Sequence, residues 1–450
     1  MNKKLILINP VGQKSGFVLS RFSIFPPLSL AYVAALTPTS WDVEIIDENI
    51  EEFEFREADL VGITSFTSNI NRAYELAGLY KSKGIKVIIG GIHASLLPEE
   101  VEKFADAVII GEAEHIWRTV LNDFENKSLK KRYKGTTVDC KNYHILPRRD
   151  LLSSKYFWGT IQTSRGCPFN CDFCSVTQYL GTQYRKKNIE NILDELETID
   201  NEYVFFLDDN LIGHGPESES KAIELFQGMI KRNIRKKWWM QTSLNTGENE
   251  EVLKYASKSG CLFALVGIET ISEESLKDMR KGINLKIGVK NFKKIIDKFH
   301  KYGIGVLGTF IIGNENESTK YYKELADFII KTGVDAVQIS ILTPLPGTNL
   351  YKRLKNQGRL IYDHYPNDWK KYRFSYLVHE SHGVTEKEVY WGNNYIKSQI
   401  YSPYNFTLRM IKSLFALKKL DSFSAIYKMN KVYKRSWEKS HYFKKFNNDK

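Results

Sequence analysis

Short apolar runs alternate with helical patterns along the first 125 residues of the chain. We interpret five uninterrupted apolar runs as buried strands, over residues 4–9, 43–46, 60–65, 87–91 and 107–110. Apolar residues spaced three or four apart predict helices over residues 28–35, 71–83, 98–104 and 116–124. Strands that alternate with helices in this way predict an α/β fold, with a doubly wound parallel sheet covered by helices on both faces.

The alternation stops at residues 126–155, which are polar, basic and without a clear period, so we expect a linker there. Six further strands are predicted over residues 159–163, 203–207, 238–243, 262–268, 305–312 and 336–341. Helical patterns separate them, which fits a partial parallel (β/α)6 barrel. Beyond this barrel the pattern changes to aromatic and basic helices. We therefore expect a sheet domain (residues 1–125), a linker (126–155), a barrel (156–350) and a helical region (351–450).

Three of the five cysteines, Cys167, Cys171 and Cys174, lie within eight residues, directly after a predicted strand. An odd number of cysteines in this arrangement indicates a metal site in a reducing compartment and not a disulfide framework. Three thiolates can hold three irons of a 4Fe–4S cluster and leave the fourth iron open to another ligand. The alternatives are a zinc site or a closed cluster, but Cys140 and Cys261 do not lie at motif spacing for a fourth ligand.

Polar residues and glycines follow the predicted strands of the first sheet. Ligands of doubly wound sheets bind at the carboxyl ends of the strands, so these residues are candidates for a binding site. They are Asn9, Asp47, Asn49, Ser65, Thr67, Gly90, Gly91, His93, Gly111 and Glu112. The alternative for His93 is a loop histidine that only forms hydrogen bonds.

The C-x-x-x-C-x-x-C motif, with the aromatic Phe173 before its last cysteine, resembles the hallmark of radical S-adenosylmethionine (SAM) enzymes. The resemblance implies that SAM chelates the open iron, and that one electron from the cluster splits SAM and releases a 5′-deoxyadenosyl radical. It also implies SAM contacts from Phe173 and from the ends of the barrel strands, at Asp208, Asp209, Asn210, Gln241, Ser243 and Glu269. Helix capping is the alternative role for Asp208, Asp209 and Glu269.

The first domain resembles the cobalamin-binding domain that precedes the barrel in one large class of these enzymes. The similar segments are residues 26–28, 61–65, 90–93 and 110–114. Some cobalamin domains carry a D-x-H-x-x-G motif whose histidine ligates cobalt, but here the corresponding residues 47–52 read DENIEE. We therefore expect cobalamin to bind without a lower ligand from this motif. The alternative is a vestigial domain that binds nothing.

The resemblance implies a methyltransferase that transfers a methyl group from cobalamin to an unactivated carbon. Radical cyclisation, rearrangement or carbon–carbon coupling without methyl transfer is the first alternative, and a non-catalytic iron–sulfur redox or regulatory protein is the second. Residues 362–395 resemble the C-terminal region of hopanoid methylases and related enzymes, which implies a lipid-like substrate. An external electron donor of the flavodoxin or ferredoxin type is also implied. No residue is predicted as the catalytic acid or base.

Hydrophobic residues make up 42% of the chain, which excludes wholesale disorder. Its net charge is +12, and residues 401–450 contribute +9 of it, from twelve Lys and Arg against three Asp and Glu. The catalytic domains are therefore close to neutral, and a nucleic-acid partner is not expected for them. Leu408, Ile411, Phe415 and Leu417 are predicted to share one face of a basic helix, which suits an anionic membrane surface. RNA binding and a simple packing helix are the alternatives.

The N-terminal apolar run is only about five residues long, which is too short for a signal peptide. No stretch approaches the roughly 18 apolar residues of a spanning helix. We therefore expect a cytoplasmic protein with a peripheral contact to the inner face of the membrane.

Overall fold

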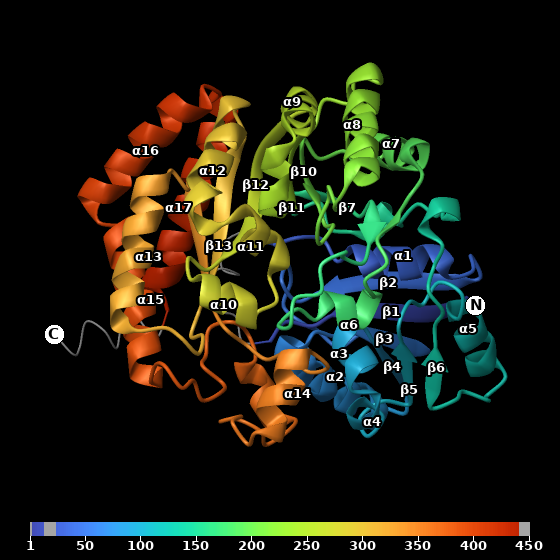
Figure 1. Cartoon of the computed structure of the whole chain (residues 1–450). Helices are drawn as coiled ribbons and strands as arrows, with labels where there is room; N and C mark the ends of the chain where they lie inside the picture. Colours follow the sequence, from blue (N-terminus) through green and yellow to red (C-terminus); the bar gives the residue numbers. More distant parts are fainter. Residues whose placement is uncertain (1, 13–23, 441–450) are drawn as a thin grey trace.

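The computed structural model describes residues 2–12 and 24–440. The N-terminal sheet lies beside the barrel sheet, and the C-terminal helices cover the far flank of the barrel (Figure 1). The last ten residues of the predicted basic region, 441–450, lie outside the described residues. Within the described residues, no helix is long and apolar enough to cross a membrane.

The first sheet is fully parallel, with the strand order β2-β1-β3-β4-β5-β6. Its strands are β1 (Lys3–Asn9), β2 (Trp41–Asp47), β3 (Leu60–Thr64), β4 (Lys86–Gly90), β5 (Ala107–Ile110) and β6 (Arg132–Lys134). Helices α1 (Leu28–Leu36) and α5 (Trp117–Glu125) cover one face, and α2 (Ile70–Ser82), α3 (Ile92–Leu96) and α4 (Pro98–Val101) cover the other. The doubly wound fold predicted from the sequence is confirmed.

Two elements of this domain differ from the prediction. Strand β6 lies inside the segment expected to be a linker, because of its three residues only Tyr133 is buried and the apolar pattern is too short to detect. The helix predicted over residues 98–104 is the single turn α4, and the short helix α3 precedes it. Pro98 at the first position of α4 separates the two.

The second sheet is also parallel, and its order β7-β10-β11-β12-β13-β14 follows the sequence, as in a partial barrel. Its strands are β7 (Gly159–Ile161), β10 (Tyr203–Phe206), β11 (Lys237–Thr242), β12 (Cys261–Glu269), β13 (Gly305–Ile312) and β14 (Ala336–Ile341). The helices are α7 (Ile189–Glu197), α8 (Pro216–Lys231), α9 (Glu250–Lys258), α10 (Glu273–Asp278), α11 (Gly282–Ile287), α12 (Phe292–Lys301) and α13 (Thr319–Thr332).

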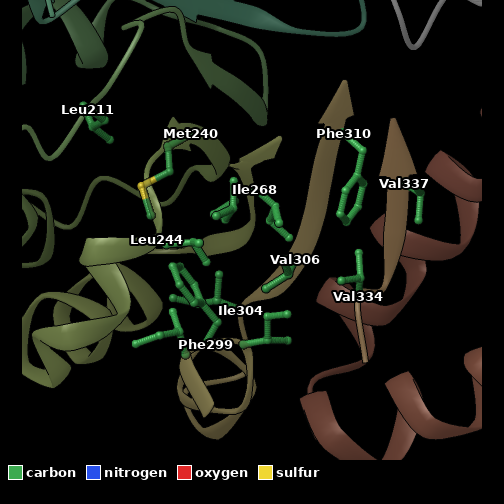
Figure 2. Close-up of a cluster of buried hydrophobic side chains, with 14 of the residues drawn as sticks. Leu211, Met240, Leu244, Ile268, Phe299, Ile304, Val306, Phe310, Val334 and Val337 are labelled. Atoms are coloured by element: carbon green, nitrogen blue, oxygen red, sulfur yellow. The ribbon is translucent and has the colours of Figure 1, made fainter. Parts of the chain in front are cut away.

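A continuous apolar core joins the outer face of this sheet to its helices. Figure 2 shows part of it, where Met240, Ile268, Val306 and Phe310 of the strands meet Phe299 of α12. Successive strand residues point to opposite faces, so the alternate residues Trp239, Phe263 and Leu307 face the inside of the barrel. The core therefore holds the strand ends, where the predicted site lies, in fixed positions.

The C-terminal region consists of α14 (Asn349–Asn356), α15 (Glu386–Ile400), α16 (Pro403–Leu417) and α17 (Leu420–Glu438). Helix α15 packs against α13, and Ile426 and Met429 of α17 pack on the inner face of the barrel sheet. The prediction that Leu417 shares an exposed face with Phe415 is wrong. Leu417 is 1% exposed and packs in the core, whereas Phe415 is 73% exposed, because residues two apart in a helix, at about 100° per residue, point to nearly opposite sides.

Candidate active site between the two sheets

The cysteine loop follows β7 and lies between β8 (Ser164–Arg165) and the short helix α6 (Val176–Leu180). Cys171 is buried and Cys167 and Cys174 are partly buried. Burial raises the pKa of all three thiols, and for Cys174, where Cys171 and Cys167 add to the effect of burial, the pKa is raised to about 12. Metal binding to such thiols must release protons, because only the thiolate ligates iron.

The three cysteines lie on one short loop, as the ligands of a single cluster do. Among residues 2–12 and 24–440, no three His, Cys, Asp or Glu side chains converge on one point as the ligands of one ion would. In a 4Fe–4S cluster each thiolate binds a different iron, so the three sulfur atoms need not converge. The thiols nevertheless lie close enough to act on one another electrostatically.

Asp208 supports the start of the cysteine loop. It is fully buried, and its carboxylate accepts hydrogen bonds from the backbone N–H of Thr163 (3.1 Å), from Thr163 Oγ1 (2.8 Å) and from Ser164 Oγ. Burial raises the pKa of Asp208, while these donors favour its charged form. The structure therefore gives Asp208 a supporting role, with its hydrogen-bonding capacity directed into the protein.

Asp209, the next residue, is solvent-accessible at the same strand end. The surrounding protein and, to a lesser extent, Asp208 raise the pKa of Asp209 to about 7. Its charge acts on the Cys167 and Cys174 thiols, which places it beside the cysteine loop. A carboxylate here is able to accept hydrogen bonds from a cationic ligand group.

The predicted residues Asn210, Gln241 and Ser243 lie together at the ends of β10 and β11. Asn210 is buried, donates to Ser243 Oγ (3.1 Å) and accepts from the backbone N–H of Gly213 (3.1 Å). Gln241 Nε2 donates to the Asp208 carbonyl oxygen (3.4 Å), and its side chain is only partly buried. Asn210 and Ser243 thus hold the loop in shape, and Gln241 remains within reach of a ligand.

Glu269 ends β12 in the left-handed region, with φ of 68°, and is 6% exposed. Its carboxylate pairs with Lys281 (2.9 Å), which the sequence analysis did not identify. The Lys281 ammonium is also close enough to Cys171 and Cys174 for their charges to raise its pKa, against the opposing effect of burial. A buried cation therefore lies beside the cysteine loop. Lysines are ordinarily exposed, so the sequence held no signal for it.

Phe173, between the last two cysteines, is partly buried and packs against Leu342, Leu350 and Leu354. The adjacent Asp172 is 4% exposed, and its carbonyl oxygen accepts from the Leu350 N–H (3.1 Å). Leu350 and Leu354 belong to α14, so this helix supports the cysteine loop from behind. The sequence analysis predicted a helical region from residue 351 onward but not its contact with the cysteine loop.

A cavity of about 560 Å³ lies between the first sheet, α1, α5 and the barrel. Its lining is largely apolar and includes Leu7, Ile63, Ile88 and Ile109. Gly91, with φ of 96°, also lines it, and a side chain there would clash with the protein itself, because its Cβ atom would lie 2.7 Å from the Ser65 carbonyl oxygen. A largely apolar cavity at the carboxyl ends of the strands suits a large cofactor such as cobalamin.

The candidate residues of the first sheet divide into two groups. The cavity is lined by Asn9, Asn49, Gly90, Gly91, Gly111 and Glu112. The other four, Asp47, Ser65, Thr67 and His93, are buried behind this lining. The pocket also includes Phe25, Phe66, Gln162, Arg165, Tyr179 and Leu180, which were not predicted. Their signal in the sequence is weak, because they come from separate segments of both domains that meet only in the fold.

His93 does not face the cavity. It is fully buried, with Nδ1 3.1 Å from Thr67 Oγ1 and Nε2 3.4 Å from Glu100 Oε1. The ring of Trp369 lies edge-on to it. Both ring nitrogens have protein partners, so the structure agrees with the hydrogen-bonding role and not with cobalt ligation.

Buried ion pairs join the two domains beside the cavity. Glu112 pairs with Arg185 (Oε2 to Nη1, 3.1 Å) and with Arg165 (3.3 Å), and Arg165 also pairs with Glu114. Arg165 lies two residues before Cys167, and both Arg165 and Glu112 line the cavity. The cavity therefore reaches the residues that carry the cysteine loop, and two cofactors bound at these places would face each other.

Two family profiles match the chain in the order that this geometry requires. The B12 binding domain matches residues 15–121 and the Radical SAM superfamily matches residues 161–329. The first covers strands β2 to β5 of the first sheet, and the second covers the cysteine loop and the barrel strands β10 to β13. The cofactors of the chain are therefore a 4Fe–4S cluster, SAM and cobalamin.

Two named methyltransferases are similar in sequence to most of the chain. Bacteriochlorophyllide d C-12(1)-methyltransferase of Chlorobaculum tepidum is 30% identical over 430 residues, which cover 90% of this chain and 91% of that protein. Hopanoid C-2 methylase of Rhodopseudomonas palustris is 28% identical over 359 residues, which cover 76% and 65% of the two chains.

Solved structures share the fold at low sequence identity. The radical SAM methyltransferase TsrM of Kitasatospora setae, with cobalamin and a 4Fe–4S cluster bound, has a TM-score of 0.72 at 15% identity and covers 98% of this chain and 100% of its own. The cobalamin-dependent radical enzyme OxsB, with aqua-cobalamin and SAM bound, has a TM-score of 0.70 at 17% identity and covers 97% and 72%. With a relative 30% identical along nine-tenths of both chains, this chain belongs to the radical SAM methyltransferases that carry a cobalamin-binding domain.

Proposed function

We propose that the protein methylates an unactivated carbon of a large hydrophobic small molecule. The observation that carries this proposal is the position of the cysteine loop beside the cavity of the first sheet, with Arg165 and Glu112 shared between them. When bound, the cluster and SAM supply the radical that removes a substrate hydrogen, and cobalamin supplies the methyl group. One chain needs both sites side by side because the two events concern the same substrate carbon.

The residues divide into those that contact ligands and those that support them. Asp209 and Gln241 have accessible polar groups, and the Glu269–Lys281 pair lies beside the cysteine loop; Asp209, Gln241 and Glu269 bind the polar end of SAM. Asp208, Asn210 and Ser243 hold the loops that carry these residues. Phe173 lies beside the adenine. Contacts to cobalamin come from Asn9, Asn49, Gly90, Gly91, Gly111 and Glu112.

The names of the similar proteins support a hydrophobic substrate. Two of them act on bacteriochlorophyllide and others methylate hopanoids, and both substrate types are large and mostly apolar. The apolar residues Phe25, Tyr179, Leu180 and Leu207 line the barrel side of the cavity and suit such a surface. A 24% identical relative is named a cyclase, so radical cyclisation is the alternative outcome.

The test uses SAM with a deuterated methyl group. The protein, loaded anaerobically with cluster and cobalamin, is incubated with SAM, a reductant and the lipid and pigment fractions of cells that lack the gene. We expect one apolar compound to gain the mass of one deuterated methyl group. A product that carries no deuterium, formed together with 5′-deoxyadenosine, would favour cyclisation. Labelling confined to the polar fraction would contradict the hydrophobic substrate.

The proposed contact with a membrane rests on α16. Tyr404, Ile411 and Phe415 are 77%, 49% and 73% exposed and follow one another at helical spacing, and Leu420 after the helix is 77% exposed. Lys412, Lys418 and Lys419 accompany them, and no Asp or Glu occurs between Tyr404 and Leu420. Exposed apolar residues flanked by lysines suit the surface of an anionic bilayer.

This contact is tested by flotation with anionic and neutral liposomes. The double variant I411S/F415S should lose binding to vesicles that contain phosphatidylglycerol, whereas L79S, at an apolar residue that is 37% exposed on α2, should retain it. Equal binding of wild type, I411S/F415S and L79S to these vesicles would contradict the proposed membrane contact. The remaining part of the proposal is an external one-electron donor, which the reductive cleavage of SAM requires.

A further inference from the structure

Helix α14 forms the outer wall of the cysteine loop. Its residues Leu350 and Leu354 pack with Phe173, and the Leu350 N–H donates to the carbonyl oxygen of Asp172 (3.1 Å). Asp172 stands between Cys171 and Phe173 in the sequence. Figure 1 shows α14 at the edge of the molecule, near α10 and the helices of the first domain. One face of this helix therefore contacts the cluster loop, and the other faces outward.

The outward face of α14 is strongly basic. Lys352, Arg353 and Lys355 are all exposed, and the helix contains no Asp or Glu. Within the described residues, no ion pair engages Lys352 or Lys355. The lysines of α13 differ, because Lys320 and Lys331 pair with Glu324 and Asp327 on the same helix. Lys352 and Lys355 thus carry positive charges that no ion pair among the described residues neutralises, and they are able to attract an acidic partner.

Two of the exposed arginines at this face reach the cluster loop directly. Arg353 Nη1 lies 3.5 Å from Asp172 Oδ2, and Arg280 Nε lies 3.3 Å from Asp172 Oδ1. The side chains of Arg353 and Arg280 are 41% and 63% exposed, whereas that of Asp172 is 5% exposed. A single layer of side chains therefore separates this surface from the residue next to a cluster ligand.

We propose that the outer face of α14, together with Arg280, is the docking surface for an acidic one-electron carrier protein. This inference rests on the proposed function, because a cluster that cleaves SAM reductively must receive electrons. In the docked complex one electron leaves the reduced carrier and enters the cluster, and no bond forms or breaks in this step. The basic face orients an acidic carrier and increases its rate of association, and α14 keeps the path to the cluster short.

The experiment measures the rate at which reduced flavodoxin, an acidic one-electron carrier, reduces the cluster of the full-length protein. Stopped-flow absorbance follows the bleaching of the cluster at low and high ionic strength. The variant K352E/K355E leaves Arg353 and Arg280 in place, so the contacts with Asp172 persist. We expect its second-order rate constant to fall by about tenfold or more at low ionic strength, and the difference to shrink as salt is added.

The matched control K323E/K331E makes the same change of charge on α13 and should reduce at the wild-type rate. Photoreduced deazariboflavin, a small uncharged reductant, should reduce the cluster of all three proteins equally. If flavodoxin reduces K352E/K355E as fast as wild type at low ionic strength, the docking surface is wrong while the proposed function stands. If the wild type releases no 5′-deoxyadenosine even with the small reductant, the proposed function is wrong, and this inference, which rests on it, is wrong as well.

Discussion

Asp208 and Asp209 are adjacent carboxylates in different environments. Asp208 accepts three hydrogen bonds inside the protein, whereas Asp209 is accessible beside the cysteines. The pair of acidic residues was apparent in the sequence, but the division of roles was not, because it depends on which carboxylate meets the Thr163–Ser164 segment. The cysteine motif was predictable from the sequence because its ligands lie within eight residues. Lys281 was not, because its partner Glu269 lies on another element.

We predict that Asp208→Ala destabilises the protein and disorders the cysteine loop. The change leaves the Thr163 N–H and two hydroxyl groups without a buried acceptor, which costs about 1–3 kcal/mol for each unsatisfied group. Thermal unfolding of the cluster-free protein should occur several degrees lower, and reconstitution should incorporate less iron. Asp209→Asn should leave both quantities near wild type and weaken SAM binding. Equal melting temperatures for Asp208→Ala and wild type would contradict the supporting role.

Lys281 gives a second prediction at this scale. Lys281→Met leaves Glu269 as an uncompensated buried charge, which destabilises the protein by about 3–5 kcal/mol. The double change Lys281→Met with Glu269→Gln should restore most of this loss. Because a nearby cation favours the reduced cluster, Lys281→Met should lower its midpoint potential. The double variant, which also removes the negative charge of Glu269, should shift the potential less, and Lys281→Arg should leave it near wild type. An EPR-monitored redox titration measures the potential. An unchanged midpoint potential in Lys281→Met would show that the charge of this lysine does not act on the cluster.

At the scale of elements, Asp335 joins the C-terminal helices to the barrel. Its carboxylate accepts from His300 Nε2 (2.8 Å), from the Val306 N–H (2.7 Å) and from Ser413 Oγ of α16 (2.5 Å). Its backbone carbonyl accepts from Arg409 of α16 and from Asn430 of α17. These contacts fix α16 on the barrel and leave its opposite face exposed. The basic region is therefore partly a packing element and partly a free surface.

This network predicts a pH dependence of stability. Burial lowers the pKa of His300, but Asp335 outweighs it, so the pKa stands above its ordinary value. The stabilisation by protonated His300 is fully present below about pH 6.5 and is lost as the pH rises through the raised pKa. The melting temperature of wild type should therefore exceed that of His300→Gln most in acid and least in alkali. A difference that does not change with pH would exclude the ion pair.

The strands were the most predictable elements. Parallel strands buried on both faces give uninterrupted apolar runs, which is why β3, β4 and β13 were located from the sequence. The edge strand β6 was not predicted, because two of its three residues are exposed. Helix α14 falls mostly within the region predicted to be helical, but its bounds were not predicted, because its short length and charged outer face give only a weak helical pattern. Its position behind the cysteine loop depends on contacts across about 180 residues, which no local pattern records.

At the scale of the whole molecule, the two domains are joined by buried polar contacts. Tyr32 of the first domain accepts a hydrogen bond from Lys187 (2.6 Å) and donates to Glu195 (2.9 Å) of the barrel domain. Glu112 of the first domain pairs with Arg185 and Arg165 beside the cysteine loop. Such contacts keep the cavity and the cluster loop in one fixed relation. The sequence predicted both domains but not this interface, because its members are scattered along the chain.

We predict that wild type unfolds in a single calorimetric transition, because neither domain can melt without exposing these buried charges. Arg185→Met leaves Arg165, at 3.3 Å, as the cation paired with Glu112, and the transition of this variant should broaden or divide into two. Arg132→Met, which removes exposed ion pairs on β6, is the control and should retain the single transition. Two separate transitions in wild type would show that the interface does not couple the domains.

The most direct test is the release of 5′-deoxyadenosine. Anaerobic protein that carries cluster and cobalamin is incubated with SAM and a chemical reductant, and the nucleoside is quantified by mass spectrometry for wild type and Cys171→Ala. We predict release by wild type only, with cobalamin still bound to Cys171→Ala, because the cavity of the first sheet does not contain this cysteine. No release by wild type, or equal release by both proteins, would contradict a radical SAM centre at the cysteine loop.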